Sequence, residues 1–197
     1  MTLKLVIGLG NPGTQYVDTR HNVGAATIAV LVKRLGATMR SHTSRCHVAE
    51  ARIGILPGGA PGPKITLAVA DSYMNVSGGP LSRLAQYLRI SPDEILVIHD
   101  DLDLPAHQLR LKQGGGEGGH NGLRSLSQHL GDRNYGRLRI GIGRPPGRQN
   151  PADFVLEKIS SAAREEWNVT YELAADTVED VAVRGFAAAQ QDLHSRS

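Results

Sequence analysis

The hydrophobic pattern along the chain predicts strands that alternate with helices. Short aliphatic or alternating runs that end at glycine or turn residues predict buried β-strands, and the segments with this pattern are residues 3–9, 47–55, 64–69, 95–98, 108–112 and 137–142. Apolar residues spaced three or four positions apart predict helices, and these segments are residues 25–35, 80–88, 123–130 and most of the chain from residue 160 onward. This alternation indicates an α/β fold with a central sheet in a single domain over residues 1–197.

The composition favours a globular protein without disulfide bonds. Cys46 is the single cysteine, so no disulfide can form within the chain and no thiolate metal cluster can be built. The first predicted strand begins at the third residue, which leaves no room for a signal peptide. No apolar run approaches the ~20 residues that span a bilayer. We therefore expect a cytoplasmic protein that does not associate with membranes, and nothing in the sequence requires more than a monomer.

The charge along the chain is uneven. The net charge is +3, with a basic excess in residues 1–50 and 101–150 and an acidic excess in residues 151–197. The basic stretches also contain the glycine-rich motifs. This distribution fits a polyanionic partner at that face, and it fits an unevenly charged solvated surface equally well.

Residues 8–13, GLGNPG, follow the first strand and match the G-x-G-x-x-G fingerprint of dinucleotide-binding folds. That fingerprint needs a helix that begins inside the loop and an acidic residue about 20 positions later. Here a turn follows, and Lys33 and Arg34 stand where the acidic residue is expected. We interpret the motif instead as a sharp turn at the carboxyl end of a strand, which displays the side chain of Asn11.

Two polar motifs precede predicted helices. Residues 19–24, TRHNVG, place His21 where it can act as a base in a cleft or can only cap the helix. Residues 72–78, SYMNVSG, place Asn75 before the next helix, where turn chemistry alone also explains it. Either Asn75 or Ser77 is the expected helix cap.

Residues 99–105, HDDLDLP, follow a buried strand at the edge where open α/β sheets bind ligands. One interpretation is a divalent-metal site made of carboxylates and histidine. The other is a single carboxylate that holds a catalytic histidine in its correct tautomer. Alternation along a strand points Asp100 and Asp101 to opposite faces, which argues against a compact metal cluster and favours the second interpretation.

A glycine loop and a basic strand complete the candidate chemistry. Glycines are dense in residues 114–122, which is typical of a loop that meets a ligand through its backbone or that opens and closes. Asn121 can cap the following helix and donate to a substrate oxygen. Arg137 and Arg139 share one face of the last strand, and with Lys112 they can grip a phosphate.

Taken together, these motifs resemble those of the bacterial-type peptidyl-tRNA hydrolase family. The resemblance rests on six segments in family order, namely residues 6–13 with Tyr16, 19–24, 73–78, 99–105, 114–123 and 137–145. It implies a single α/β domain with a mixed, twisted sheet flanked by helices, of the phosphorylase/hydrolase-like kind. It also implies hydrolysis of the ester that joins a peptide to the 3′-terminal ribose of tRNA, with no metal and no cofactor.

The resemblance also implies roles for individual residues. The family's general base falls on His21, and the carboxylate that keeps it basic falls on Asp100. The other positions are Asn11, Asn75 and Asn121 for positioning the substrate, Tyr16 and Tyr73 for contacting tRNA, and Lys112 and Arg139 for clamping the 5′-phosphate. Asn11 is also expected to distinguish blocked from free aminoacyl groups and to act, with Asn121 as the alternative, on the developing oxyanion.

Two alternatives stay open. The chain departs from the family pattern at residues 70–72 and 106–107, and Asp71 adds negative charge near the expected RNA face. One alternative is a non-catalytic, RNA-binding relative of the family, although the presence of both His21 and Asp100 argues against it. The other is a metal-dependent phosphoesterase that uses the histidine and aspartates of residues 99–103.

Overall fold

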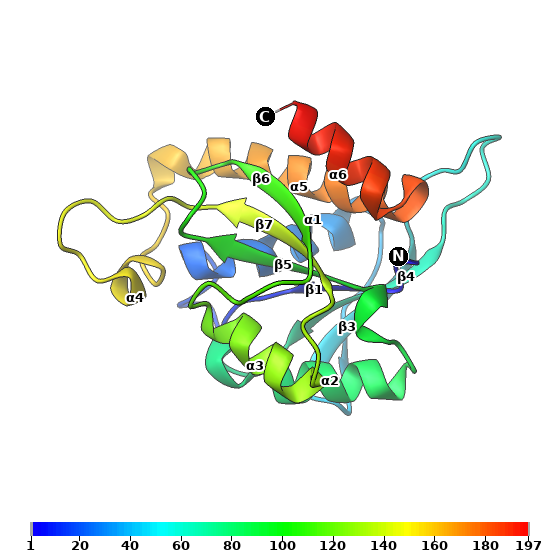
Figure 1. Ribbon diagram of the computed structural model, residues 1–197, viewed down its shortest axis with the longest axis horizontal. Coiled ribbons are helices and arrows are strands. Elements are labelled where there is room, and N and C mark those ends of the chain that lie inside the picture. The colour runs from blue at the N-terminus through cyan, green and yellow to red at the C-terminus, as the bar shows by residue number, and fades with distance from the viewer. Residues whose placement is uncertain (1, 197) are drawn as a thin grey trace.

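Seven strands form one mixed sheet in the computed structural model, which describes residues 2–196 (Figure 1). The strands are β1 (Leu5–Gly8), β2 (Arg40–His42), β3 (Cys46–Arg52), β4 (Lys64–Ala70), β5 (Ile95–Asp101), β6 (Leu109–Gln113) and β7 (Gly136–Gly141). Their order across the sheet is β2-β3-β4-β1-β5-β7-β6. The strands β4, β1, β5 and β7 run parallel, whereas β2, β3 and β6 pair antiparallel with their neighbours. The predicted α/β fold with a mixed sheet is confirmed.

Helices cover both faces of this sheet. They are α1 (Val23–Arg34), α2 (Gly78–Tyr87), α3 (Asn121–Leu130), α4 (Pro151–Phe154), α5 (Arg164–Arg184) and α6 (Phe186–Ser195). Short 3₁₀ turns precede three of them, namely η1 (Arg20–Asn22), η2 (Met74–Val76) and η4 (Ser161–Ala163), and a fourth, η3 (Pro92–Glu94), precedes β5. In Figure 1, α1, α5 and α6 lie on one side of the sheet and α2 and α3 on the other. Two separate apolar clusters of buried side chains, one on each side, hold these layers together.

Two glycines let α1 begin directly against the carboxyl ends of β1 and β5. A Cβ at Gly24 would stand 2.2 Å from the carbonyl oxygen of Ile98, and one at Gly8 would stand 2.4 Å from the carbonyl oxygen of Gly24. Real Cβ atoms do not approach that closely, so only glycine permits this packing. The residues just before α1, including His21, are thereby held next to the end of β5.

The structure corrects several details of the predicted elements. Strand β2 is a polar, three-residue edge strand, and α4 spans four residues, so neither carries a hydrophobic period that predicts it. The side chain of Ser77 stands at the start of α2 but donates to the carbonyl of Met74 instead of capping the helix. The prediction that Asn121 caps α3 is wrong, because Asn121 is the first helical residue and His120 provides the cap.

The last helix covers the open edge of the sheet. Strand β6 is an edge strand, so one side of its backbone has no strand partner. Gln190 of α6 donates through Nε2 to the carbonyl of Leu111 at 2.9 Å, and the amide of Leu111 donates to Nε2 of His194 at 3.1 Å. An uncovered edge strand invites pairing with another chain. Side chains of α6 therefore take the place of a neighbouring strand at Leu111.

Within residues 2–196, none of the helices is both long enough and apolar enough to cross a membrane.

Candidate functional site

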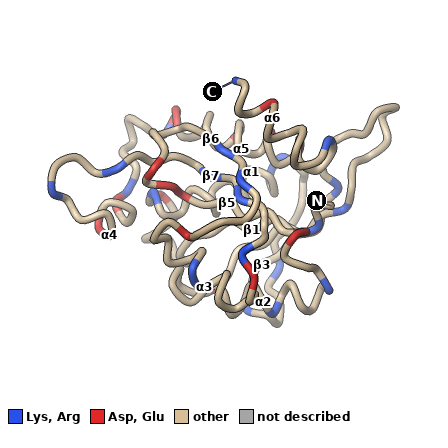
Figure 2. Tube along the Cα trace, viewed as in Figure 1, with Lys and Arg blue, Asp and Glu red and all other residues tan. Residues whose placement is uncertain are grey.

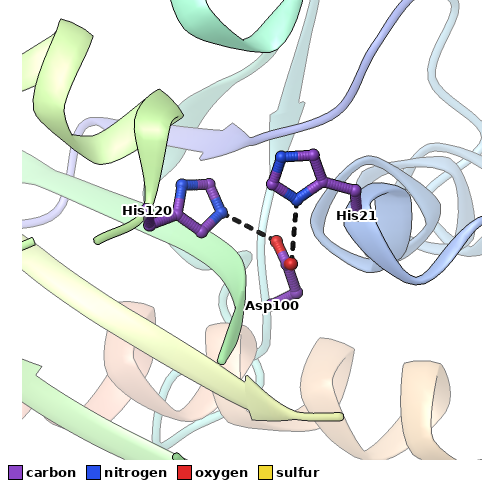
Figure 3. A group of neighbouring side chains, drawn as sticks. All are labelled: His21, Asp100 and His120. Atoms are coloured by element: carbon purple, nitrogen blue, oxygen red, sulfur yellow. Dashed lines mark hydrogen bonds and ion pairs between the residues drawn. The ribbon is translucent and has the colours of Figure 1, made fainter. Parts of the chain in front are cut away.

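The carboxyl end of β5 carries a buried aspartate whose oxygens are all bound by histidines. Nδ1 of His21 lies 2.9 Å from Oδ2 of Asp100, and Nε2 of His120 lies 2.7 Å from Oδ1 (Figure 3). Nδ1 of His99 lies 2.8 Å from the main-chain carbonyl oxygen of Asp100. The structure thus brings together the predicted pair His21 and Asp100, and it adds two histidines to them.

His21 reaches the carboxylate from the α1 side of the sheet. It lies in η1, where its backbone amide donates to the carbonyl of Val155 at 2.8 Å. Because Asp100 accepts at Nδ1, that nitrogen carries the proton of the neutral ring, and Nε2 keeps its lone pair. In Figure 3 this second nitrogen points away from the carboxylate. It is therefore the atom that can accept a proton from a bound molecule.

His120 reaches the same carboxylate from the α3 side. Its Nδ1 accepts the backbone amides of Gly122 and Leu123 at 3.1 and 3.3 Å, which makes it the N-cap of α3. A nitrogen that accepts two amides cannot carry a proton, so the proton of His120 stands on Nε2 and is donated to Asp100. The tautomer of His120 is therefore set by the helix that it caps.

The charges at this site favour a basic His21. Burial opposes protonation of His21, but the negative charge of Asp100 and its hydrogen bond outweigh burial and raise the pKa of His21. Burial also tends to raise the pKa of Asp100, yet His21 and His120 outweigh it and hold that pKa well below the usual range. Asp100 is therefore ionised at neutral pH, and it stabilises an imidazolium at His21.

His99 is neutral and lies deeper than the other two rings. Its side chain is buried, and burial together with the nearby His120 lowers its pKa to about 4. Its Nδ1–H is donated to the carbonyl of Asp100, and its Nε2 has no hydrogen-bond partner among the described residues. His99 therefore holds the backbone of Asp100 in place.

Asn11 lies in the turn after β1, and its neighbours set the orientation of its amide. The carbonyl oxygen Oδ1 of Asn11 accepts the amide of Met74 at 2.7 Å, which leaves the donor Nδ2 without a partner among the described residues. The backbone of Asn11 is held at both polar atoms by Asn22, whose Oδ1 accepts the amide and whose Nδ2 donates to the carbonyl, each at 2.9 Å. No helix begins inside this turn. This agrees with the interpretation that the glycine motif does not bind a dinucleotide.

A cavity of about 160 Å³ opens beside the carboxylate. Its walls include His21, Asp100, His120 and Asn121, and Pro151, Ala152 and Val155 close it from the segment around α4. Asn11 and Asn75 do not line this cavity. Of the three predicted asparagines, Asn121 is therefore the one in its wall.

The two predicted tyrosines face each other outside the cavity. The rings of Tyr16 and Tyr73 are 6.2 Å apart between centroids, in an edge-to-face arrangement. The side chain of Tyr73 is 55% exposed, and the neighbouring Asn75 is exposed on η2. Two aromatic edges and an amide are thus open to a ligand at this surface.

A second cavity of about 220 Å³ adjoins the first, and His99, Asp101, Glu117 and Gly118 line both. Lys112 and Arg139 also line it, so the structure brings this predicted pair together. Nε of Arg139 donates to Asp101 at 2.8 Å, which leaves the two terminal nitrogens of its guanidinium for a ligand. Asp101 therefore points away from His21, as strand alternation predicts.

Arg137 lines the same cavity as Lys112 and Arg139, as predicted, but its terminal nitrogens are already bound by backbone carbonyls. It is almost fully buried, and its terminal nitrogens donate to the carbonyls of Gly114, Gly115 and Gly116 at 2.7 to 3.0 Å. A guanidinium whose terminal donors are taken by the backbone has little left for phosphate. Arg137 instead anchors the glycine loop from below.

One group at the site offers ligand atoms for a metal. His21, Asp100 and His120 each offer an atom, and these atoms lie within 4.8 Å of one another. The nitrogens that face the carboxylate are the protonated ones, so a cation would have to displace both protons. The same three residues form a complete set of hydrogen bonds without an ion.

Comparison with known proteins agrees with the geometry. A family model described as peptidyl-tRNA hydrolase matches residues 5–197. The chain belongs to the peptidyl-tRNA hydrolase family. A protein named peptidyl-tRNA hydrolase from Kineococcus radiotolerans is 52% identical over 191 residues, which cover 97% of this chain and 96% of the relative. One from an Arthrobacter species is 47% identical over the same shares of both chains.

A solved structure of the family has the same fold. Peptidyl-tRNA hydrolase from Acinetobacter baumannii superimposes with a TM-score of 0.86 at 32% identity, covering 98% of this chain and 94% of the other. The fold class and the family suggested by the sequence are thus both confirmed.

Two residues escaped the sequence-based assignment. His120 stands inside the glycine loop next to Asn121, and Asn22 stands next to His21 in a motif chosen for its histidine. A histidine directly before a predicted helix is a signal for a helix cap, but its contact with Asp100 joins positions 20 residues apart. The contact between Asn22 and Asn11 likewise depends on how η1 folds back onto the turn after β1.

Proposed function

We propose that the protein hydrolyses the ester between a peptide and the 3′-terminal ribose of tRNA, with His21 as the base that activates water. The observation that carries this proposal is the 2.9 Å contact between Nδ1 of His21 and the buried carboxylate of Asp100 beside a cavity. Membership of the peptidyl-tRNA hydrolase family supplies the substrate class.

In the proposed reaction, Nε2 of His21 takes a proton from water while the water oxygen attacks the ester carbonyl. The imidazolium that forms is stabilised by Asp100. When the tetrahedral intermediate breaks down, the same nitrogen returns the proton to the departing ribose oxygen, and peptide and tRNA are released. General-base catalysis of this kind contributes ~10²–10⁴-fold.

An asparagine amide is proposed to bind the oxygen that becomes negative during attack. Asn121 lines the cavity, and Asn11 presents an unpartnered donor because the amide of Met74 takes its oxygen. We assign the oxyanion to Asn121 and the acyl end of the substrate to Asn11. A single donor of this type contributes ~3–4 kcal/mol to transition-state binding in a hydrolase where it has been removed.

The tRNA is proposed to bind across the adjoining surfaces. Lys112 and Arg139 share one cavity and would clamp the 5′-phosphate, with the guanidinium donating two hydrogen bonds and the ammonium adding a point charge. Tyr16, Tyr73 and Asn75 would contact the unpaired 3′ end, since aromatic side chains support unstacked bases. The proposal further includes a monomeric enzyme that works in the cytoplasm.

The deciding experiment follows release of peptide from N-acetylaminoacyl-tRNA, with and without excess EDTA. The His21→Ala variant should lose most turnover but keep tRNA binding, and EDTA should leave the unsubstituted protein unaffected. Near-normal turnover of His21→Ala would end the assignment of His21. Peptide release that survives EDTA would dismiss the metal-dependent phosphoesterase, its loss in EDTA would overturn the metal-independent mechanism, and absence of any hydrolysis would favour a non-catalytic RNA-binding relative.

A further inference from the structure

A cluster of arginines lies near β2 and β3, at the opposite end of the strand order from β6 and β7, where the phosphate clamp is proposed. Residues 36–49 and 79–92 contain four arginines, two histidines and no aspartate or glutamate. The arginines are exposed, and they belong to β2, to the turn between β2 and β3, and to α2 and the residues after it. We call this set the arginine surface, and its cations are Arg40, Arg45, Arg83 and Arg89. Figure 2 shows basic positions along α2 and the strands beside it.

Hydrogen bonds join the parts of the arginine surface. Nη2 of Arg83 on α2 donates to the carbonyl of Ser44 in the β2–β3 turn at 3.3 Å. The carbonyl of Arg45 accepts the amide of Asp71, which follows β4, at 2.8 Å. The hydrogen bond from Asp71 holds the β2–β3 turn to the segment between β4 and η2. The hydrogen bond from Arg83 holds α2 to the same turn.

One acidic residue, Asp71, lies beside this surface. Its Oδ2 is 3.7 Å from Nε2 of His47, and Arg45 is held beside it through the backbone. Asp71 also lies in one of the two segments where the chain departs from the family pattern. Its negative charge is therefore set within an excess of positive charge at the arginine surface.

The β2–β3 turn of the arginine surface, which carries Arg45, lies on the same sheet edge as the candidate active site. The carboxyl ends of β4, β1 and β5 meet at one edge, and the antiparallel pairing of β3 with β4 brings the β2–β3 turn to it as well. Lys112 and Arg139 stand on β6 and β7 at the other end of the strand order. His21 and Asp100 lie between these two basic regions.

This order suggests which part of the substrate meets the arginines. In the proposed function, on which this step rests, the tRNA 5′-phosphate lies over β6 and β7 and the ester lies at the end of β5. The peptide is attached on the other side of the ester carbonyl from the tRNA. Beyond Tyr73 and Asn75, which are proposed to contact the RNA 3′ end, it continues toward β3 and β2.

We propose that the arginine surface binds acidic side chains of the esterified peptide, so that the charge of the peptide affects how well its peptidyl-tRNA is recognised. Three to four strand spacings of ~4.8 Å separate the end of β5, where the ester lies, from the β2–β3 turn, which is about 14–19 Å. An extended peptide advances ~3.3 Å per residue. The fifth and sixth residues from the ester are thus the ones that reach the arginines.

The test compares peptidyl-tRNAs that differ only at those residues. N-acetylated hexapeptidyl-tRNAs carry Glu, Gln or Lys at the fifth and sixth positions from the ester, and N-acetylaminoacyl-tRNA serves as a substrate too short to reach the surface. The protein is compared with Arg45→Gln/Arg83→Gln and with the control Arg196→Gln, which removes an exposed arginine of α6. KM and kcat are measured at low and at high salt.

The Glu peptide should have a KM about 2- to 10-fold below that of the Lys peptide at low salt, because exposed ion pairs are weak and screened. The difference should shrink at high salt and disappear in the double variant, while Arg196→Gln retains it and all proteins hydrolyse the short substrate equally. Equal KM values for the three peptides would overturn the proposal.

A double variant that raises KM equally for every substrate, the short one included, would also overturn it, because the arginines would then contact RNA. Absence of hydrolysis of the short substrate by the unsubstituted protein would instead overturn the proposed function, and this proposal with it.

Discussion

Replacing Asp100 with asparagine tests the arrangement of the active site most directly. The carboxylate accepts two ring N–H groups, one from His21 and one from His120. An amide has one oxygen and one NH₂ group, so it can accept from one ring and must donate to the other. The tautomers of the two rings decide which way the amide turns.

His120 cannot change its tautomer, because its Nδ1 accepts the amides of Gly122 and Leu123. The oxygen of Asn in Asp100→Asn must therefore face His120, and its NH₂ group must face Nδ1 of His21. That nitrogen then has to accept, so the proton of His21 moves to Nε2. A protonated Nε2 cannot take a proton from water.

The size of the effect on the His21 tautomer follows from the hydrogen bond between position 100 and His120. If the amide turned the other way, its NH₂ group would face the Nε2–H group of His120, and no hydrogen bond could form between these two donors. An unmade buried hydrogen bond costs about 1–3 kcal/mol. The productive tautomer is therefore reduced about 5- to 150-fold. Loss of the charge that stabilises the imidazolium adds to this, and we expect kcat to fall by ~10²–10⁴-fold in total.

A second substitution separates the effect of the changed His21 tautomer from the effect of the lost negative charge. His120→Asn keeps a side chain that caps helices well but is too short to replace the imidazole at Asp100. In the double variant Asp100→Asn/His120→Asn, the amide at position 100 is free to turn its oxygen to His21. The double variant should then be more active than Asp100→Asn alone, by up to the 5- to 150-fold of the tautomer effect.

The assay is single-turnover release of peptide from N-acetylaminoacyl-tRNA, with urea unfolding as the control for folding. His120→Asn alone should lose less activity than Asp100→Asn. The reasoning is refuted if Asp100→Asn retains near-normal kcat, or if the folded double variant is no more active than Asp100→Asn.

Four further outcomes are expected. The pKa of His21 is raised and its neutral form is the base, so kcat should rise with pH through a midpoint above that of free histidine; a flat profile would contradict this. Arg139→Gln should raise KM about tenfold on 5′-phosphorylated tRNA and hardly at all on 5′-hydroxyl tRNA, which titration with both tRNAs would measure. Arg137→Met should destabilise the fold by ~2–4 kcal/mol in urea unfolding, because three loop carbonyls lose charged donors; unchanged stability would disprove its anchoring role. Replacing Gln190 and His194 with alanine should expose the edge at Leu111, lower Tm and promote self-association seen by light scattering.

The sequence by itself determined most of the elements and the family. Apolar runs marked β1, β4 and β5, because buried parallel strands need apolar side chains on both faces. Alternation along β5 separated Asp100 from Asp101, and the structure bears this out in their different partners, His21 and Arg139. Each of these inferences depends on neighbours along the chain, which is why sequence alone suffices for them.

The tertiary structure decided what depends on contacts between distant segments. His120 and Asp100 stand 20 residues apart, and only the docking of α3 on the sheet makes the cap of one helix a partner of the carboxylate. Arg137 shares a strand face with Arg139, yet burial under the glycine loop gives it an anchoring role instead of a ligand-binding one. Strand patterns show which way a side chain points, but not what covers it, because the covering residues come from elsewhere in the chain.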